Sequence, residues 1–172
     1  MARYRRRLTR DQKLVVSAVA AGLLMAASNS HGAATAGRVG NTLTARMVPA
    51  GSSYTAASWA AALLTAGGWP QTACNLSAVT AWERAEGGHW ANGARFNPLN
   101  TTQPEPGSWS MNSAGVQAYP SWRSGFAATL ATLGNGRYSP VLSALSAGTS
   151  ARAVADAVAA SPWGTAWFQA DC

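Results

Sequence analysis

The carboxylates are the first residues to consider, because few other side chains of this chain are suited to acid–base chemistry. Outside residues 1–36 the sequence holds only five. Asp171 stands beside the C-terminus, Asp156 lies in an Ala-rich helical pattern typical of a solvated face, and Glu105 lies between two prolines. Glu83 and Glu86 stand together at the end of a predicted helix. We therefore expect any acid–base chemistry to centre on that helix end.

Glu86 is the strongest candidate for a proton donor. A carboxylate at a helix C-terminus opposes the negative end of the helix dipole, so its pKa should rise. A raised pKa is what a general acid in glycoside cleavage requires, and the glycines at 87–88 would let backbone or a ligand approach closely. An ordinary surface glutamate is the alternative. Glu83 could share the same face or pair with an arginine such as Arg84 or Arg95.

The pattern of the remaining chain predicts helices on both sides of an irregular insert. One helix begins at Tyr54 and ends at a Gly-Gly-Trp-Pro stop, and a second starts near Asn75, a good N-cap, and ends at Glu86. The insert, residues 89–120, has no helical period. Further elements are expected as extended segments at 98–102 and 115–119, helices at 121–133, 140–145 and 150–160, and a turn at 163–168. This order predicts a mainly helical α+β domain with a cleft beside the insert.

The N-terminal region predicts export. A basic segment, residues 1–13, precedes the apolar run 14–27, which is too short to span a bilayer comfortably as a helix. Ala34-Thr35-Ala36 supplies a small-x-small cleavage site. We expect residues 1–36 to be a signal peptide or an uncleaved membrane anchor, 37–51 a linker, and 52–172 an extracytoplasmic domain. The membrane is expected to be contacted only through the N-terminal segment.

The two cysteines fit an oxidising compartment. A single pair near the two ends of a small domain most simply predicts a Cys74–Cys172 disulfide. His31 and His89 are too isolated to complete a metal site, so we expect no metal and no cofactor.

The positive charge of the chain does not indicate a nucleic-acid partner. The net charge is +7, but six of the thirteen cationic side chains precede residue 14. From residue 37 onward seven arginines stand against five acids, which leaves no basic stripe to neutralise a row of phosphates.

Four segments resemble the lysozyme-like and glucosaminidase-like cell-wall hydrolase modules of actinobacteria and their phages. They are AWERAEGGHW (81–90), FNPLNTT (96–102), GVQAYPS (115–121) and GFAATL (125–130), and the similarity covers about Tyr54 to Thr165. The resemblance implies a lysozyme-like fold and cleavage of peptidoglycan glycan strands. We also expect the secreted chain to be a monomer.

The resemblance also implies roles for individual residues. The family's proton donor falls on Glu86, and its groove-lining Asn and Tyr positions fall on Asn97, Asn100 and Tyr119. We expect the insert to form the substrate-binding wall, with Trp90 and Thr102 contributing. In the alternative, Asn97, Asn100 and Thr102 satisfy backbone groups in a tight turn.

The sequence departs from the usual two-carboxylate schemes, because no second catalytic carboxylate stands at a matching position. Related folds work with one glutamate, since the substrate's N-acetyl group or its 6-hydroxyl acts as nucleophile. Hydrolysis and anhydro-sugar formation both remain open, and Glu105 is the best second candidate.

Other functions are weighed against this one. A cysteine peptidase would need Cys74 free beside His89, and a serine hydrolase lacks a nucleophile elbow. The stronger rival is a non-catalytic wall-binding or virion structural module of the same fold. In such a module sugars would stack on Trp90, Trp109, Tyr119 and Trp122 without cleavage.

Overall fold

The computed structural model describes residues 53–166 and 168–172, so the predicted leader and linker lie outside the described residues. Within the described part, five helices accompany one small antiparallel sheet, as the α+β prediction required. None of the described helices is both long and apolar enough to cross a membrane.

Two helices precede the insert. Helix α2 (Ala56–Gly67) begins at a capping box made by Thr55 and Ser58, and ends at Gly68 in the left-handed conformation. Helix α3 (Ala73–Glu86) is capped by Thr72, so the predicted N-cap at Asn75 was wrong. Asn75 is instead fully buried, and its Nδ2 donates to the carbonyl oxygens of Pro70 and Leu145 at 2.8 and 2.7 Å.

The insert carries less regular structure than predicted. Strand β1 (Trp109–Ser110) pairs antiparallel with β2 (Gln117–Ala118). The second extended candidate, 115–119, therefore contains a strand, whereas the candidate at 98–102 forms a turn and a loop. β1 was missed, because a strand of two residues is too short to set up a recognisable alternation of apolar and polar side chains.

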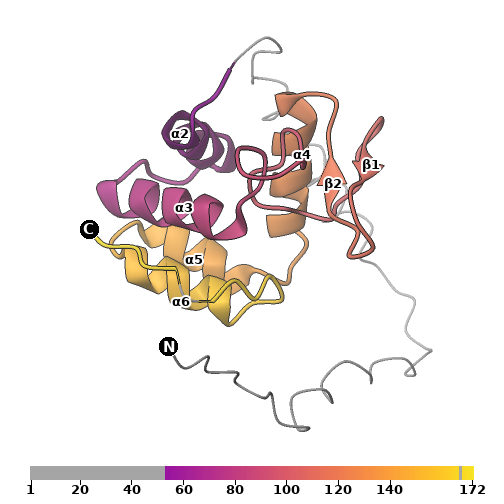
Figure 1. The fold of residues 1–172 in the computed structure, drawn as a ribbon. Helices are drawn as coiled ribbons and strands as arrows, with labels where there is room; N and C mark the ends of the chain where they lie inside the picture. Colours follow the sequence, from indigo (N-terminus) through magenta and orange to yellow (C-terminus); the bar gives the residue numbers. More distant parts are fainter. Residues whose placement is uncertain (1–52, 167) are drawn as a thin grey trace, which may run out of the picture. The chain divides into compact units, whose positions relative to one another are not determined.

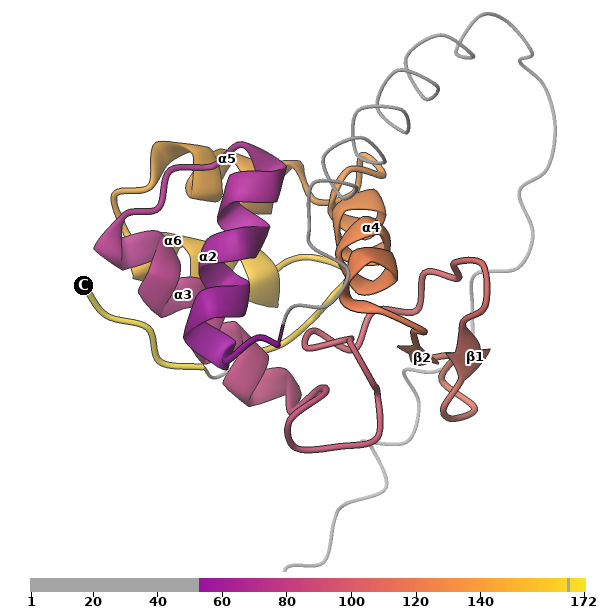
Figure 2. The same ribbon diagram turned by 90° about the horizontal axis from the view of Figure 1, so that it is seen from above.

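Three helices follow the insert: α4 (Trp122–Leu133), α5 (Ser139–Ala147) and α6 (Ala151–Ala159). Helix α2 packs against α3 and α4, while α6 packs against α3 and α5. Figures 1 and 2 show the hairpin beside α4, with the C-terminal segment running back past α3. The predicted turn at 163–168 contains no helix in its described residues.

The core is formed by apolar side chains from all five helices and from the loop after α3. Its largest fully buried members are Trp59, Trp82, Tyr119 and Phe126. Trp59 stacks on Phe126 with ring centroids 5.4 Å apart, which fastens α2 to α4. The insert reaches this core through Leu99, which is fully buried.

The predicted disulfide is present and closes the chain end onto the helical body. Cys74, in the first turn of α3, is bonded to Cys172 with Cα atoms 4.9 Å apart. The bond leaves no free cysteine among the described residues. The thiol nucleophile that a cysteine peptidase would need is therefore unavailable at Cys74.

Candidate active site at the end of helix α3

The site begins where α3 ends. Gly87 terminates the helix in the left-handed conformation, with φ 62°, and its N–H donates to the carbonyl of Glu83 at 2.9 Å. At Gly88 an added Cβ would stand 2.2 Å from the carbonyl oxygen of Asn97 and 2.3 Å from that of Pro98. Glycine at 88 therefore allows the loop 97–100 to cross directly over the helix end.

Glu86 lies in that crossing with its carboxyl half-buried. The hydroxyl of Thr165, from the C-terminal segment, donates a hydrogen bond to Glu86 Oε1. Asn100 donates from Nδ2 to the backbone carbonyl of Glu86 at 2.6 Å. Segments 14 and 79 residues away in sequence thus hold the end of α3 from two sides.

Burial raises the pKa of Glu86 above its ordinary value. Hydrogen-bond donors, with Thr165 the strongest and Trp82, Asn100 and Trp163 behind it, oppose that rise by favouring the anion. The indole N–H of Trp82 also favours the Glu86 anion, although it makes no hydrogen bond of normal geometry. Glu86 therefore holds its proton more firmly than an exposed glutamate, while the anion left after proton transfer is also stabilised.

The wall beside Glu86 is aromatic. Trp163 packs edge-to-face on Trp82 at 4.8 Å, and its Nε1 donates to the carbonyl of Leu99 at 3.2 Å. Trp163 and Thr165 were not among the predicted site residues. The expected tail disulfide was the only sequence signal that this segment returns to α3, and it did not indicate which side chains meet Glu86.

Glu83 has different surroundings, although it lies one turn earlier. Its side chain is 3% exposed, and among the described residues neither carboxyl oxygen has a hydrogen-bond partner. Burial raises its pKa to about 9. The structure shows no ion pair with Arg84, which is exposed, or with Arg95, whose guanidinium lies 5.2 Å from the ring centre of Phe96.

Asn97 and Tyr119 brace the insert from within. Both are fully buried. Asn97 donates to the carbonyls of Thr101 and Gln117 at 2.9 and 2.7 Å and accepts from the N–H of Thr101 at 2.9 Å. Tyr119 donates its hydroxyl proton to the carbonyl of Gln103 at 2.7 Å. These contacts agree with the alternative hypothesis, in which Asn97 satisfies backbone groups in a tight turn.

Asn100 is the predicted groove residue that the structure places beside Glu86. Its backbone is in the left-handed region, with φ 51°, and its Oδ1 accepts from Nδ2 of Asn92 at 3.1 Å. It also lines a groove of about 240 Å³ whose other walls come from the loop after α3 and from the hairpin, namely Asn92, Gly93, Ala94, Met111, Asn112 and Val116. We name this space the Asn100 groove; Asn100 is its residue that contacts the end of α3 at Glu86.

The other predicted ligand-binding residues lie at the surface. Thr102 is exposed, and Trp90 has 42% of its surface exposed. Trp109 and Met111, exposed at 44% and 40%, are two residues apart at the start of the hairpin and so point to the same side of it. Trp109 therefore extends the apolar surface that Met111 presents to the Asn100 groove.

His89 and Glu105 are the remaining candidate residues, and the structure shows what each of them contacts. Nδ1 of His89 accepts the N–H of Phe96 at 2.8 Å, and burial lowers the pKa of the imidazole. Glu105 lies at the turn before β1. Burial raises the pKa of the Tyr119 hydroxyl, and the charge of Glu105 raises it further. No group of three or more His, Cys, Asp or Glu in the described ranges could hold a metal ion.

Comparisons with protein-family models, with curated proteins and with solved structures find no match to this chain.

Proposed function

We propose that this chain is a glycosidase of the bacterial cell wall, which cleaves the β-1,4 glycan backbone of peptidoglycan with Glu86 as general acid. The observation that carries this proposal is the state of Glu86: a half-buried carboxyl with a raised pKa, which lies at the end of α3 and accepts a hydrogen bond from Thr165. We also propose a lysozyme-like fold, because the Glu-Gly-Gly end of α3 lies against the Asn-Pro-Leu-Asn-Thr-Thr loop.

The geometry suits proton donation to a glycosidic oxygen. Because Thr165 donates to Oε1, the acid proton is expected on Oε2. Transfer of that proton to the leaving oxygen allows the C1–O bond to break, and Thr165 then stabilises the carboxylate that remains. General acid catalysis of this kind contributes about 10²- to 10⁴-fold.

The nucleophile is assigned to the substrate or to water. Glu83, the nearest carboxyl along the chain, is kept protonated by burial and is poorly suited to attack C1 as an anion. The acetamido oxygen of the substrate, its 6-hydroxyl, or a water would then complete the reaction. Attack by the 6-hydroxyl forms an anhydro-sugar, so hydrolase and lytic transglycosylase both fit the same site. Glu105 stays a prediction as the second group.

The Asn100 groove offers the contacts that an amino-sugar strand requires. Amide side chains of Asn92, Asn100 and Asn112 line it and are suited to acetamido and hydroxyl groups. The exposed Met111 and Trp109 provide apolar surface for the flat faces of pyranose rings. The groove therefore supports binding of a polymer of acetylated sugars next to Glu86.

An extracytoplasmic location belongs to the same proposal. The Cys74–Cys172 disulfide supports it, because structural disulfides persist mainly in oxidising compartments. Peptidoglycan lies in such a compartment.

A non-catalytic wall-binding module is the second candidate, because two of the four rings expected to stack on sugars are exposed. Trp90 and Trp109 are accessible, whereas Tyr119 and Trp122 are buried. Incubation of the protein with purified peptidoglycan separates the two functions. We expect release of new reducing ends or anhydro-sugars, identified by mass analysis of the soluble fragments. Co-sedimentation without any release would contradict the enzyme proposal.

A further inference from the structure

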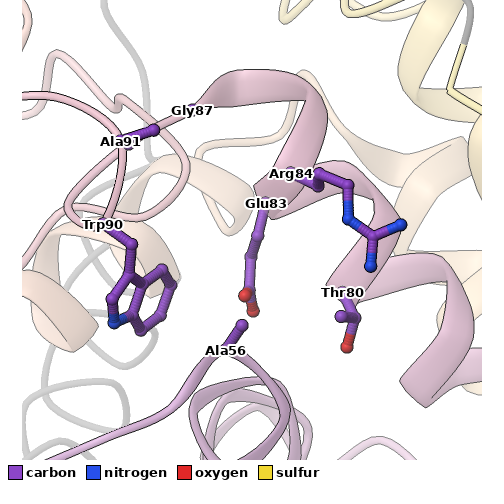
Figure 3. A pocket seen from close by; sticks show the side chains of 8 residues that line it. Ala56, Thr80, Glu83, Arg84, Gly87, Trp90 and Ala91 are labelled. Carbon is purple, nitrogen blue, oxygen red and sulfur yellow. The ribbon is translucent and has the colours of Figure 1, made fainter.

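A second pocket lies on the α2 side of α3 and is not part of the Asn100 groove. Its volume is about 230 Å³, and the side chains that define it are Ala56, Thr80, Glu83, Arg84, Trp90 and Ala91. Figure 3 shows Glu83 pointing from α3 toward Ala56, with Trp90 on one side and Thr80 and Arg84 on the other. We name this space the Glu83 pocket.

The carboxyl of Glu83 is the unexplained group in this pocket. Its side chain is 3% exposed, and neither oxygen has a hydrogen-bond partner among the described residues. A buried polar group without a partner costs about 1 to 3 kcal/mol. With a pKa of about 9 the group is a neutral acid at pH 7, which has one O–H to donate. It therefore lacks a hydrogen-bond acceptor.

The remaining walls restrict what that acceptor is. Ala56, Ala91 and the ring of Trp90 make most of the pocket apolar. A cation would need the carboxyl to ionise there and would face the positive charge of Arg84. An anion could pair with Arg84, but that side chain is exposed to solvent, and the anion would leave the apolar walls without a partner. A small neutral group with a carbonyl oxygen and a methyl fits all of these surroundings.

We propose that the Glu83 pocket binds an acetamido group, with the carboxyl of Glu83 donating to the amide oxygen and the methyl group resting against Trp90. The volume agrees with this size, because sites for whole drug-sized ligands occupy about 300 to 1,000 Å³. Every sugar of a peptidoglycan strand carries such a group or a derivative of it. The loop after α3 lines both the Glu83 pocket and the Asn100 groove, so one strand can reach both. In this respect the inference rests on the proposed function.

The test uses β-1,4-linked N-acetylglucosamine tetramer as the probe and Glu86→Gln as the background, so that no cleavage occurs. Binding is followed through the indole N–H signal of Trp90 by NMR. Glu83→Gln, which keeps a donor, should change the dissociation constant by less than about threefold. Glu83→Met, which removes the donor, should weaken binding at least about tenfold, or 1.4 kcal/mol. The deacetylated tetramer should leave the Trp90 signal unmoved.

A variant that fills the Glu83 pocket provides a second test, in case a substitution at Glu83 disturbs folding. Ala56→Leu should occupy the pocket and weaken binding, whereas Ala57→Leu, at an exposed position one residue along α2, should not. Binding by Glu83→Met and Ala56→Leu as tight as in the background protein would overturn the inference. So would a tetramer that binds without moving the Trp90 signal.

Failure of the pocket inference and failure of the enzyme proposal give different results. If the pocket variants bind normally while the wild-type protein still cleaves peptidoglycan, the pocket inference fails and the enzyme proposal stands. If the tetramer binds through the Glu83 pocket while the wild-type protein releases nothing, the pocket inference stands and the enzyme proposal fails.

Discussion

Glu83 and Glu86 are one helical turn apart, yet their surroundings give them different chemistry. Glu86 is half-buried and accepts a hydrogen bond from Thr165, and Asn100, which lines the Asn100 groove, donates to its backbone carbonyl. Glu83 is nearly inaccessible and has no acceptor within the described part of the chain. A simple count of carboxylates in the sequence could not separate these roles, because both residues lie on the same helix end.

The first prediction concerns Thr165, whose hydroxyl lowers the pKa of Glu86 by donating to it. Under the proposed mechanism, activity requires protonated Glu86 and is lost as pH rises through the pKa of that carboxyl. Thr165→Val removes the donor at nearly constant volume, so the pKa should rise and the alkaline limb of kcat/KM should move to higher pH. Thr165→Ser keeps the donor and should leave that limb in place. An unmoved limb in Thr165→Val would show that the hydroxyl does not act on Glu86.

The second prediction concerns the stability cost of Glu83. Its pKa is about 9 in the folded chain against 4.5 ordinarily, so between these values the folded state holds a proton that the unfolded state releases. The free energy of unfolding is therefore unaffected by this ionisation below about pH 4.5. As pH rises from 4.5 toward 9, it falls by about 1.4 kcal/mol per pH unit. Glu83→Gln carries no such proton.

The stability advantage of Glu83→Gln over wild type should therefore grow with pH, to the order of 3 kcal/mol at pH 7. Urea unfolding of the two proteins at pH 5, 7 and 8.5 measures it, and Glu86 contributes equally to both. An advantage that stayed constant over this range would mean that Glu83 is not buried as a neutral acid.

At the scale of elements, the helices were largely predictable and the insert was not. Apolar side chains at helical spacing and Gly or Pro stop signals located all five described helices, and Ser121 and Ser150 cap α4 and α6 as expected of serine. The path of the insert depends instead on contacts between residues distant in sequence. The Asn97 bond to Gln117, the Tyr119 bond to Gln103 and the Asn100 bond to Glu86 are of this kind.

The third prediction separates scaffold from site within the insert. Asn97→Ala removes two buried hydrogen bonds and one partly buried hydrogen bond to backbone groups and should lower the melting temperature by several degrees, while activity per folded molecule is kept. Asn100→Gly suits the left-handed backbone at φ 51° and should lower activity with little thermal effect. Thermal unfolding and kcat/KM measured on both variants decide this. An active Asn100→Gly with a much lower melting temperature would place Asn100 in the scaffold.

At the scale of the whole molecule, the disulfide ties Cys172 to the first turn of α3. It joins residues 98 apart in sequence, and the segment that Cys172 anchors carries Trp163 and Thr165 to the end of α3. The cysteine count predicted the bond. It could not predict the contact with Glu86, because a loop of this length leaves many paths open for the intervening segment.

The fourth prediction follows from that link. The Cys74→Ser, Cys172→Ser double variant should lose up to about 4 to 5 kcal/mol of stability in the chain-entropy model. Its cleavage activity, measured well below the lowered melting temperature, should also fall, because Thr165 is held less firmly against Glu86. Equal activity per folded molecule in the double variant and the wild type would show that other contacts position Thr165.

The central claim is that Glu86 is the acid that cleaves the glycan strand, and one comparison tests it most directly. Reducing ends and anhydro-sugars released from purified peptidoglycan are quantified for wild type, Glu86→Gln and Glu83→Gln, with melting temperatures recorded for each. We predict at least about a hundredfold loss of turnover in Glu86→Gln at an unchanged melting temperature, and a milder effect in Glu83→Gln. Near-full activity in Glu86→Gln, with turnover lost in Glu83→Gln, would contradict it.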